Sequence, residues 1–234
     1  MSEAVSKLRQ PRTKLKDRIL PDYTKGEEIF NMVSHIVGGA LGIAALVLCV
    51  VKSAMKGDTY GVVSSSIYGS SLILLYTISS VYHGLHRNMG KKVMQVIDHC
   101  TIYYLIGGTY TVIMLAGVRR AHPGWAWSMF GLVWGLSAAA AVFTAIDHNK
   151  YRKLSMICYI AIGWCIVIAA KPTIDAIGWA PIFWILGGGI SYTIGAVLYS
   201  LGKKKGKRYM HSVFHLFVLA GSILHFFGIF FHVL

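Results

Sequence analysis

The stretch KKKGKRYMHSVFHLFVLAGSILHFFGIFF (residues 203–231) decides the fold. It places a run of lysines directly before an apolar segment, and about 20 apolar residues suffice for a helix to cross a bilayer. Six earlier segments have the same apolar character, and short connections join them. The predicted spans are residues 29–51, 60–84, 94–117, 124–146, 154–171, 179–200 and 210–233. The sequence therefore predicts an all-α membrane protein, a bundle of seven transmembrane helices.

The composition agrees with a membrane protein. Of the 234 residues, 55% are hydrophobic and only 14% are charged, whereas soluble domains carry about 25% charged residues. We expect a basic N-terminal arm at residues 1–25, without the apolar core of a signal peptide, followed by one seven-span domain at residues 26–234. The four cysteines lie in apolar stretches and form no CxxC motif, so we expect small buried side chains rather than disulfides.

The basic residues give the orientation. Because seven spans make the loops alternate between the two sides, 18 of the 23 Lys and Arg fall on the side of the arm. The positive-inside rule then places the N-terminus in the cytoplasm and the C-terminus outside, in a multi-pass protein of the plasma membrane. The net charge of +14 is thereby explained by topology and by contact with anionic lipid head groups. Nucleic acid is not expected as a partner.

Ionisable residues inside the spans are costly in a membrane and indicate function. With the predicted orientation, His83 ends the second span, Asp98 begins the third, and His211 and His215 begin the seventh. All four lie at the cytoplasmic depth of the membrane. Residues of the first span reach the same depth or slightly deeper: Glu28, Asn31, Ser34 and His35.

The spacing of these residues suggests a metal site. His211 and His215 are four residues apart and share one helix face, an arrangement typical of transition-metal sites. Together with His83 they give three imidazole ligands and one open position, the pattern of a catalytic zinc site. Asp98 would be a fourth ligand or would hold and deprotonate a water molecule. Ser79 precedes His83 by one turn and would steady that water or a carbonyl oxygen.

Each of these features has a plainer alternative. Two histidines on one helix are also found as a hydrogen-bonded core pair, and Glu28 with Asn31 is equally a helix-start pair favoured by the dipole. His99 points about 100° away from Asp98 around the helix, so we favour Asp98 at the centre. His225 and His232 lie too far along the last span to reach the same ion, and we expect them to bond between helices. The run Gly187–Gly189 would let two helices approach closely or let one bend.

These features together resemble the hemolysin III proteins of bacteria, which are relatives of the progestin and adipoQ receptors (PAQR). The resemblance extends more distantly to the alkaline ceramidases. It covers about residues 25–233 and rests on EEIFNMVSH (27–35), SSVYH (79–83), Asp98 and HSVFHLFVLAGSILHFFG (211–228). It implies zinc held by His83, His211 and His215, with Asp98 near the water and Ser79 four residues before the first ligand. The long regulatory N-terminal domain of the receptors is not matched, which weakens any transfer of receptor function.

Three functions follow as hypotheses. The first is a zinc-dependent hydrolase that cleaves an amide in a membrane lipid of the ceramide type. The second is a pore-forming hemolysin that causes cytolysis, although no span shows the polar stripe of an aqueous path. The third is a non-catalytic, zinc-stabilised protein of membrane homeostasis or sensing. The sequence does not separate an open metal site from a closed one.

Overall fold

The computed structural model describes residues 12–234, and this part of the chain is built from helices and short connections. The helices are α2 (Lys25–Met55), α3 (Thr59–Gly84), α4 (Met89–Val112), α5 (Pro123–Ile146), α6 (His148–Gly163), α7 (Ala170–Ile177), α8 (Trp179–Lys204) and α9 (Met210–Gly228). Short 3-10 or π-helical segments extend them: η1 (Leu15–Asp17), η2 (Ile113–Gly117), η3 (Val118–Arg120), η4 (Trp164–Ala169) and η5 (Ile229–Val233).

Seven of the continuous helical segments are long and apolar enough to cross a membrane, which confirms the predicted bundle. The fifth differs most from its predicted range, because it runs from His148 to Ile177 rather than from 154 to 171. Its helix passes through the 3-10 segment η4, and Pro172 lies in the first turn of α7. Proline is tolerated there because the first turn of a helix has no intrahelical use for its missing N–H. Residues 1–11 of the predicted arm lie outside the described residues.

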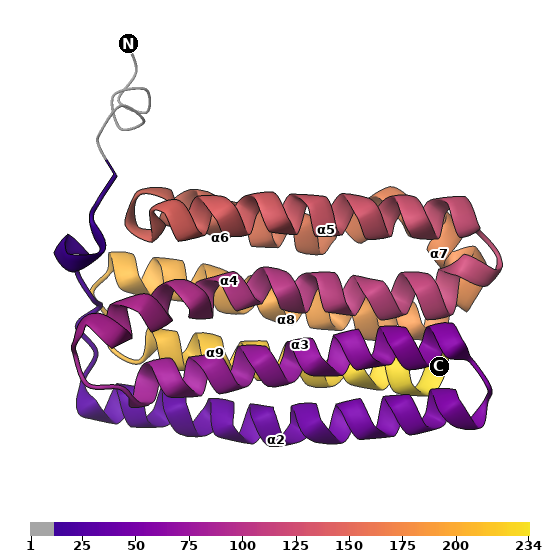
Figure 1. Ribbon diagram of the computed structural model, residues 1–234, viewed down its shortest axis with the longest axis horizontal. Helices are drawn as coiled ribbons and strands as arrows, with labels where there is room; N and C mark the ends of the chain where they lie inside the picture. Colours follow the sequence, from indigo (N-terminus) through magenta and orange to yellow (C-terminus); the bar gives the residue numbers. More distant parts are fainter. Residues whose placement is uncertain (1–11) are drawn as a thin grey trace, which may run out of the picture.

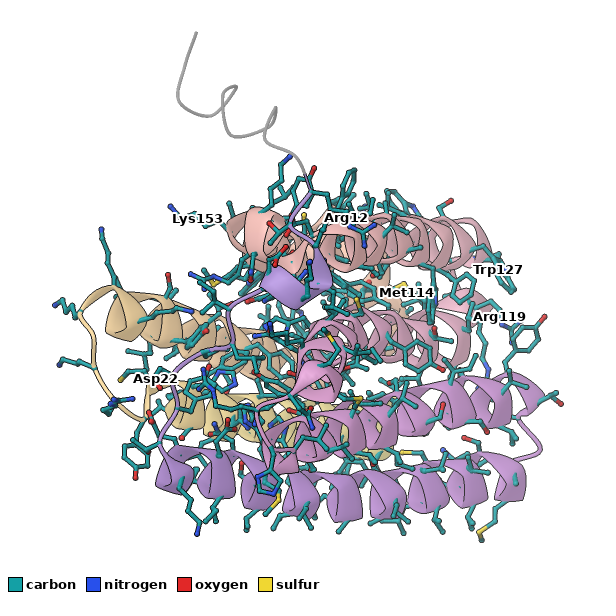
Figure 2. The ribbon with its side chains drawn as sticks, turned by 60° about the vertical axis from the view of Figure 1, so that its left-hand side comes forward. Arg12, Asp22, Met114, Arg119, Trp127 and Lys153 are labelled. Carbon is teal, nitrogen blue, oxygen red and sulfur yellow. The ribbon has the colours of Figure 1, made fainter. Side chains whose placement is uncertain are left out.

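The helices lie side by side with alternating direction (Figure 1). In that view α2 and α3 form the lower edge of the bundle and α5 and α6 the upper edge, with α4 and α8 between them. The arm segment 12–24 and the connections 85–88 and 205–209 gather at one end, which we call the basic end. The C-terminus lies at the opposite end, as seven alternating spans require. Figure 2 shows Asp22 at the basic end and Arg119 and Trp127 at the other.

The start of α2 is joined to the start of α9. Thr24 caps α2 by accepting the Glu27 backbone N–H, while the Glu27 carboxylate accepts the backbone N–H of Thr24. This reciprocal pair satisfies two donors that a helix start leaves free. The other oxygen of Glu27 accepts the backbone N–H of Tyr209 at 2.6 Å. Tyr209 precedes α9 in a left-handed conformation with φ 61°. The first turns of the two helices are thereby held at the same level.

Helices α8 and α9 approach closely at Gly188, as the glycine run predicted. A Cβ atom at this position would lie 2.1 Å from Cδ2 of His225. The close approach lets the His225 Nε2–H donate to the Ile185 carbonyl at 3.0 Å, so the predicted bond between helices is confirmed. His232 is exposed and forms no such bond with the described residues. All four cysteines are free: Cys49 is buried, and Cys100, Cys158 and Cys165 are half-buried.

Candidate metal centre

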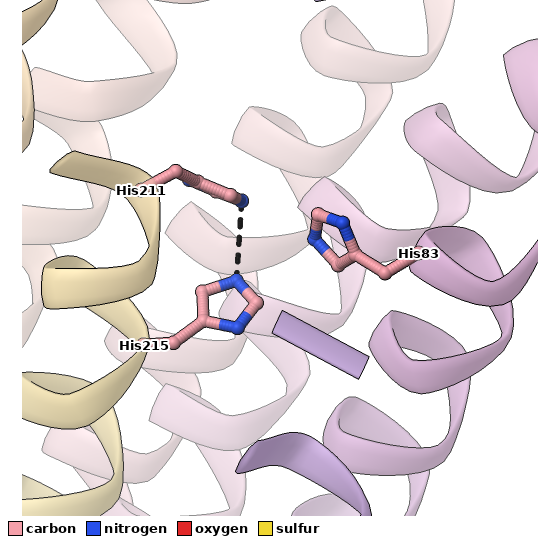
Figure 3. Close-up of side chains that lie close together, drawn as sticks. All are labelled: His83, His211 and His215. Carbon is pink, nitrogen blue, oxygen red and sulfur yellow. Dashed lines mark hydrogen bonds between the residues drawn. The ribbon is translucent and has the colours of Figure 1, made fainter. Parts of the chain in front are cut away.

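Three histidines from two helices meet at the basic end of the bundle. His83 lies in the last turn of α3, and His211 and His215 lie in the first two turns of α9. Ligand nitrogens of the three all lie within 4.8 Å of one another. Their rings face a common point (Figure 3), and they are 3%, 8% and 2% exposed. The structure thus brings together the three residues that the sequence predicted as metal ligands.

The geometry and the donor atoms of this trio fit a zinc ion. Nε2 of His211 and Nε2 of His215 are 3.1 Å apart. Zinc–imidazole bonds of about 2.0–2.1 Å in a tetrahedral site place two nitrogens about 3.3 Å apart. Nε2 of His83 is buried and has no hydrogen-bond partner. A plain hydrogen-bonded pair accounts for His211 and His215 but leaves this third nitrogen unexplained, whereas a cation accounts for all three.

Glu28 sets the orientation and the tautomer of His83. Its Oε2 lies 2.6 Å from Nδ1 of His83, and its Oε1 lies 2.7 Å from Nζ of Lys91. Because a carboxylate only accepts, Nδ1 of His83 carries the proton and Nε2 keeps the lone pair that a metal needs. Lys91 also donates to the Leu85 carbonyl at 2.9 Å, which fixes it in turn. Ligating histidines in metalloproteins commonly rest on a carboxylate in this way.

Lys91 and Glu28 show what sequence reasoning missed. The charge count assigned Lys91 to the loop after the second span, but it lies in the first turn of α4 and its side chain is 3% exposed. Glu28 was equally well explained as a helix-start acid, and the capping acid is its neighbour Glu27. One sequence signal distinguishes the two adjacent acids: Glu27, and not Glu28, lies three residues after the capping Thr24.

The first helix supplies two further polar residues. The ring of His35 stacks on that of His215, with centroids 3.6 Å apart and planes 12° from parallel. It also meets Tyr76 edge-on at 5.0 Å. Both ring nitrogens of His35 and both polar side-chain atoms of Asn31 are buried without hydrogen-bond partners. These groups add uncommitted donors and acceptors to the wall of the site.

Tyr23 covers the trio from the side of the arm. Its ring stacks on His211, with centroids 5.1 Å apart and planes 8° from parallel, and lies 6.0 Å from His83. Burial, and then the neighbouring phenols of Tyr199 and Tyr82, raise the pKa of Tyr23 well above its ordinary value. It is therefore a neutral phenol that screens the histidines from solvent. Sequence reasoning placed Tyr23 in a polar arm and did not assign it to the site.

An apolar cavity of about 140 Å³ opens on His211 and His215, two members of the trio. Ser79, Asp98, His211 and His215 line its end near the histidines, and its walls are mostly apolar side chains of α4, α6 and α8. It extends along the bundle to His225. The predicted catalytic pair thus shares one cavity with two of the predicted ligands. Asp98 does not belong to the group whose ligand atoms lie within 4.8 Å of one another.

His99 lines the same cavity as Asp98, although the two residues lie about 100° apart around α4. Nδ1 of His99 is 3.7 Å from Oδ2 of Asp98, so the two side chains approach each other. Nδ1–H of His99 donates to the Gln95 carbonyl at 2.8 Å, and its ring lies 4.0 Å from that of His148. His99 therefore faces a second group of polar residues rather than the three histidines.

Comparison with known proteins identifies the family. A model of the haemolysin-III related family matches residues 23–226. The chain belongs to this family. Every site residue described above lies in the matched range. Hemolysin-3 of Bacillus cereus is 34% identical over 208 residues, which are 89% of this chain and 92% of that protein. The hemolysin-3 homolog of Bacillus subtilis is 34% identical over 210 residues, covering 90% and 96% of the two chains.

Haemolysin III relatives of the receptor type are more distant. The human monocyte to macrophage differentiation factor is 23% identical over 213 residues, 86% of this chain and 79% of that protein. The adiponectin receptor protein of Drosophila melanogaster is 22% identical over 220 residues, 86% of this chain and 50% of the receptor. No solved structure matches the chain. The haemolysin III and PAQR resemblance seen in the motifs is thereby confirmed.

Proposed function

We propose that this haemolysin III protein is a zinc-dependent hydrolase that cleaves an amide in a membrane lipid, with ceramide-like lipids as the substrate class. One observation carries the proposal. Two of the three clustered, buried histidines, His211 and His215, line an apolar cavity that also presents a serine and a carboxylate. A cavity of this kind between membrane helices suits a lipid chain, because burying apolar carbon is favourable by about 0.8 kcal/mol per methylene group.

The metal ligands would be His83, His211 and His215. Bound there, zinc supplies Lewis acidity, which polarises a carbonyl group and makes water acidic near pH 7. Three protein ligands leave one tetrahedral position free. Asp98 lies outside the ligand group, which supports an open, catalytic site over the closed, structural site of a sensor protein.

The remaining chemistry would be carried by the chain itself. Asp98 would accept a proton from the attacking water and pass it to the amine that leaves when the C–N bond breaks. The hydroxyl of Ser79 would donate to the carbonyl oxygen as negative charge develops there. Ser79 is 2% exposed, and a hydrogen bond in such a water-poor place is stronger than one in water. His83 keeps the required tautomer through Glu28.

The surroundings of the site suggest how the protein meets the membrane. We propose that the basic end faces the cytoplasm and contacts anionic lipid heads through its arm and loops. The charge asymmetry of the loops supports this orientation. The lipid chain would enter the bundle from the bilayer and present its amide to the histidines near the cytoplasmic leaflet.

The test uses purified protein in a neutral detergent. We expect about one zinc per chain, and release of fatty acid from a labelled ceramide. Asp98→Asn should lower kcat by about 10²–10⁴-fold, the usual contribution of a general base, while zinc content and Tm stay unchanged. Asp175→Asn, which changes an acid of α7 that does not line the cavity, is the matched control. Absence of zinc, or equal turnover by wild type and Asp98→Asn, would overturn the proposal.

Cytolysis is a second candidate, supported by the name of the Bacillus cereus relative. The walls of the cavity do not favour a water-filled path, because they are mostly apolar. Dye release from liposomes separates the two functions. Release that persists after all three histidines are replaced by alanine would support a zinc-independent pore.

A further inference from the structure

A second cavity lies at the basic end, beside the first. It has a volume of about 350 Å³, and we call it the vestibule. Residues 19–21 and Tyr23 of the arm form one wall, and side chains of α3, α4, α6, α8 and α9 form the others. His99 and His211 line both the vestibule and the apolar cavity. The two cavities therefore meet at the level of the candidate metal centre.

The vestibule is electropositive. Arg152 of α6 and Lys203 of α8 line it, and no aspartate or glutamate does. Neither cation forms an ion pair with a described residue. The amine of Lys203 lies 5.8 Å above the ring of Tyr199. In contrast, Arg87 and Arg208 at the same end each pair with Asp22. Two unpaired cations facing one cavity attract an anion.

Buried polar groups with no partner also face the vestibule. Gln95 is 3% exposed and its Oε1 has no hydrogen bond, and His148 is 2% exposed and its Nδ1 has none. Buried polar atoms in proteins are nearly always bonded. The two ends of a glutamine amide exchange by rotation, so Gln95 offers either a donor or an acceptor. These uncommitted groups, deeper than the two cations, suit a ligand with several oxygens.

We propose that the vestibule binds a phosphate-type oxyanion that is the head group of the lipid whose chain occupies the apolar cavity. A phosphate monoester carries a charge of about −1.5 to −2 at pH 7, which two cations match. The planar guanidinium of Arg152 binds two phosphate oxygens at once. The inference rests on the proposed function for the occupant of the apolar cavity. It narrows the substrate from ceramide-like lipids to those with a phosphate head.

The placement of the two cavities determines where the head group and the chain of the lipid substrate lie along the bundle. With the phosphate between Arg152 and Lys203 and the chain directed toward His225, the bond between head and chain passes His211. His211 lines both cavities and is a member of the trio. The vestibule thus positions the lipid, and its cations take no part in the reaction.

The experiment measures binding without turnover, by calorimetry in a neutral maltoside detergent. The probes are dodecyl phosphate, dodecanol and inorganic phosphate. The test variant is Arg152→Gln with Lys203→Gln. The matched control is Lys153→Gln with Lys204→Gln, which removes two exposed charges adjacent in sequence to the first pair but outside the vestibule. All four side chains are exposed, so both double variants should fold.

We expect wild type to bind dodecyl phosphate at least tenfold more tightly than dodecanol. The test variant should lose this preference and the control should keep it. The same preference should persist in chelator-treated His83→Ala protein, which excludes binding of phosphate to zinc. A test variant that keeps the preference, or a control that loses it equally, would overturn the proposal. Inorganic phosphate that binds as tightly as dodecyl phosphate would overturn the lipid occupant and assign the oxyanion site to soluble phosphate.

These measurements distinguish a failure of the vestibule proposal from a failure of the proposed hydrolase function. Loss of hydrolysis with the phosphate preference intact would remove the proposed function and leave the vestibule. Hydrolysis of a neutral ceramide at the same rate in wild type and in the test variant, with no phosphate preference, would leave the proposed function and remove the vestibule.

Discussion

Replacing Glu28 by glutamine should weaken zinc binding without removing any ligand. Glu28 accepts from Nδ1 of His83 at 2.6 Å and from Lys91 at 2.7 Å. An amide has one accepting end, so one of these donors would face an NH₂ group. If that donor is His83, its ring keeps a partner only by moving the proton to Nε2, the atom that a metal needs.

The size of the effect follows from these contacts. Loss of a carboxylate behind a ligating histidine costs about 10–100-fold in metal affinity, which corresponds to about 1.4–2.8 kcal/mol. A hydrogen bond to a charged group contributes about 1.5–3 kcal/mol, so the two approaches agree. Competition with a chromophoric chelator gives the zinc Kd of each purified variant in detergent.

Glu27→Gln is the matched control for this measurement. It removes the same charge one residue away, but Glu27 bonds to Thr24 and Tyr209 and not to His83. Glu28→Gln should therefore bind zinc at least tenfold more weakly than Glu27→Gln. Equal affinities in the two variants would refute a role that Glu28 has and Glu27 lacks, because Glu27 contacts none of the three histidines.

Three further outcomes are expected. Gly188→Ala places a Cβ atom 2.1 Å from His225 and should cost about 1–3 kcal/mol of stability, seen as a lower Tm. Gly187→Ala, whose Cβ meets nothing nearer than 3.7 Å, should not change Tm, and equal shifts would contradict the packing. Burial raises the pKa of Asp147, but backbone N–H groups of Thr13 and Lys150 lower it more, to below 3.8. Its contribution to stability is then complete above pH 3.8 and is lost as the pH falls through the lower folded pKa. Asp147→Ala should thus lower the unfolding free energy by about 1 kcal/mol at pH 7, and the difference should shrink near pH 3; a difference independent of pH would argue against the shift. A chelator should lower the Tm of wild type, since a ligand at a hundredfold its Kd stabilises by about 2.7 kcal/mol, but should leave a variant lacking all three histidines unchanged.

The seven-helix fold was predictable from the sequence because hydropathy, loop length and charge are properties of consecutive residues. Because the spans alternate in direction, the position of a residue in its span gives its depth in the membrane. This places His83 at the depth of His211 and His215 without any assumption about helix packing. Helical spacing placed the last two on one face. These predictions use only the rise and the rotation per residue within a single helix, so they do not depend on how the helices pack against one another.

Contacts between helices were not predictable in the same way. Whether Glu27 or Glu28 faced the site depended on which one capped α2, and the cap in turn bonds Tyr209 from the far end of the sequence. Burial of Lys91 depended on its partner Glu28, because a lysine is almost never buried alone. The stacking of Tyr23 on His211 depended on the path of the arm. None of these leaves a periodic signal in one sequence.

The arm and its cap connect the topology of the protein to its site. Glu28 can reach His83 only if α2 begins at the level where α3 ends, and His211 meets them only if α9 begins there too. Glu27 holds α2 and α9 at that level through Thr24 and Tyr209. The segment just before α2 then places Tyr23 over the histidines. The two adjacent glutamates therefore have different roles, although they are chemically identical. Glu27 aligns α2 with α9, and Glu28 orients the ring of His83.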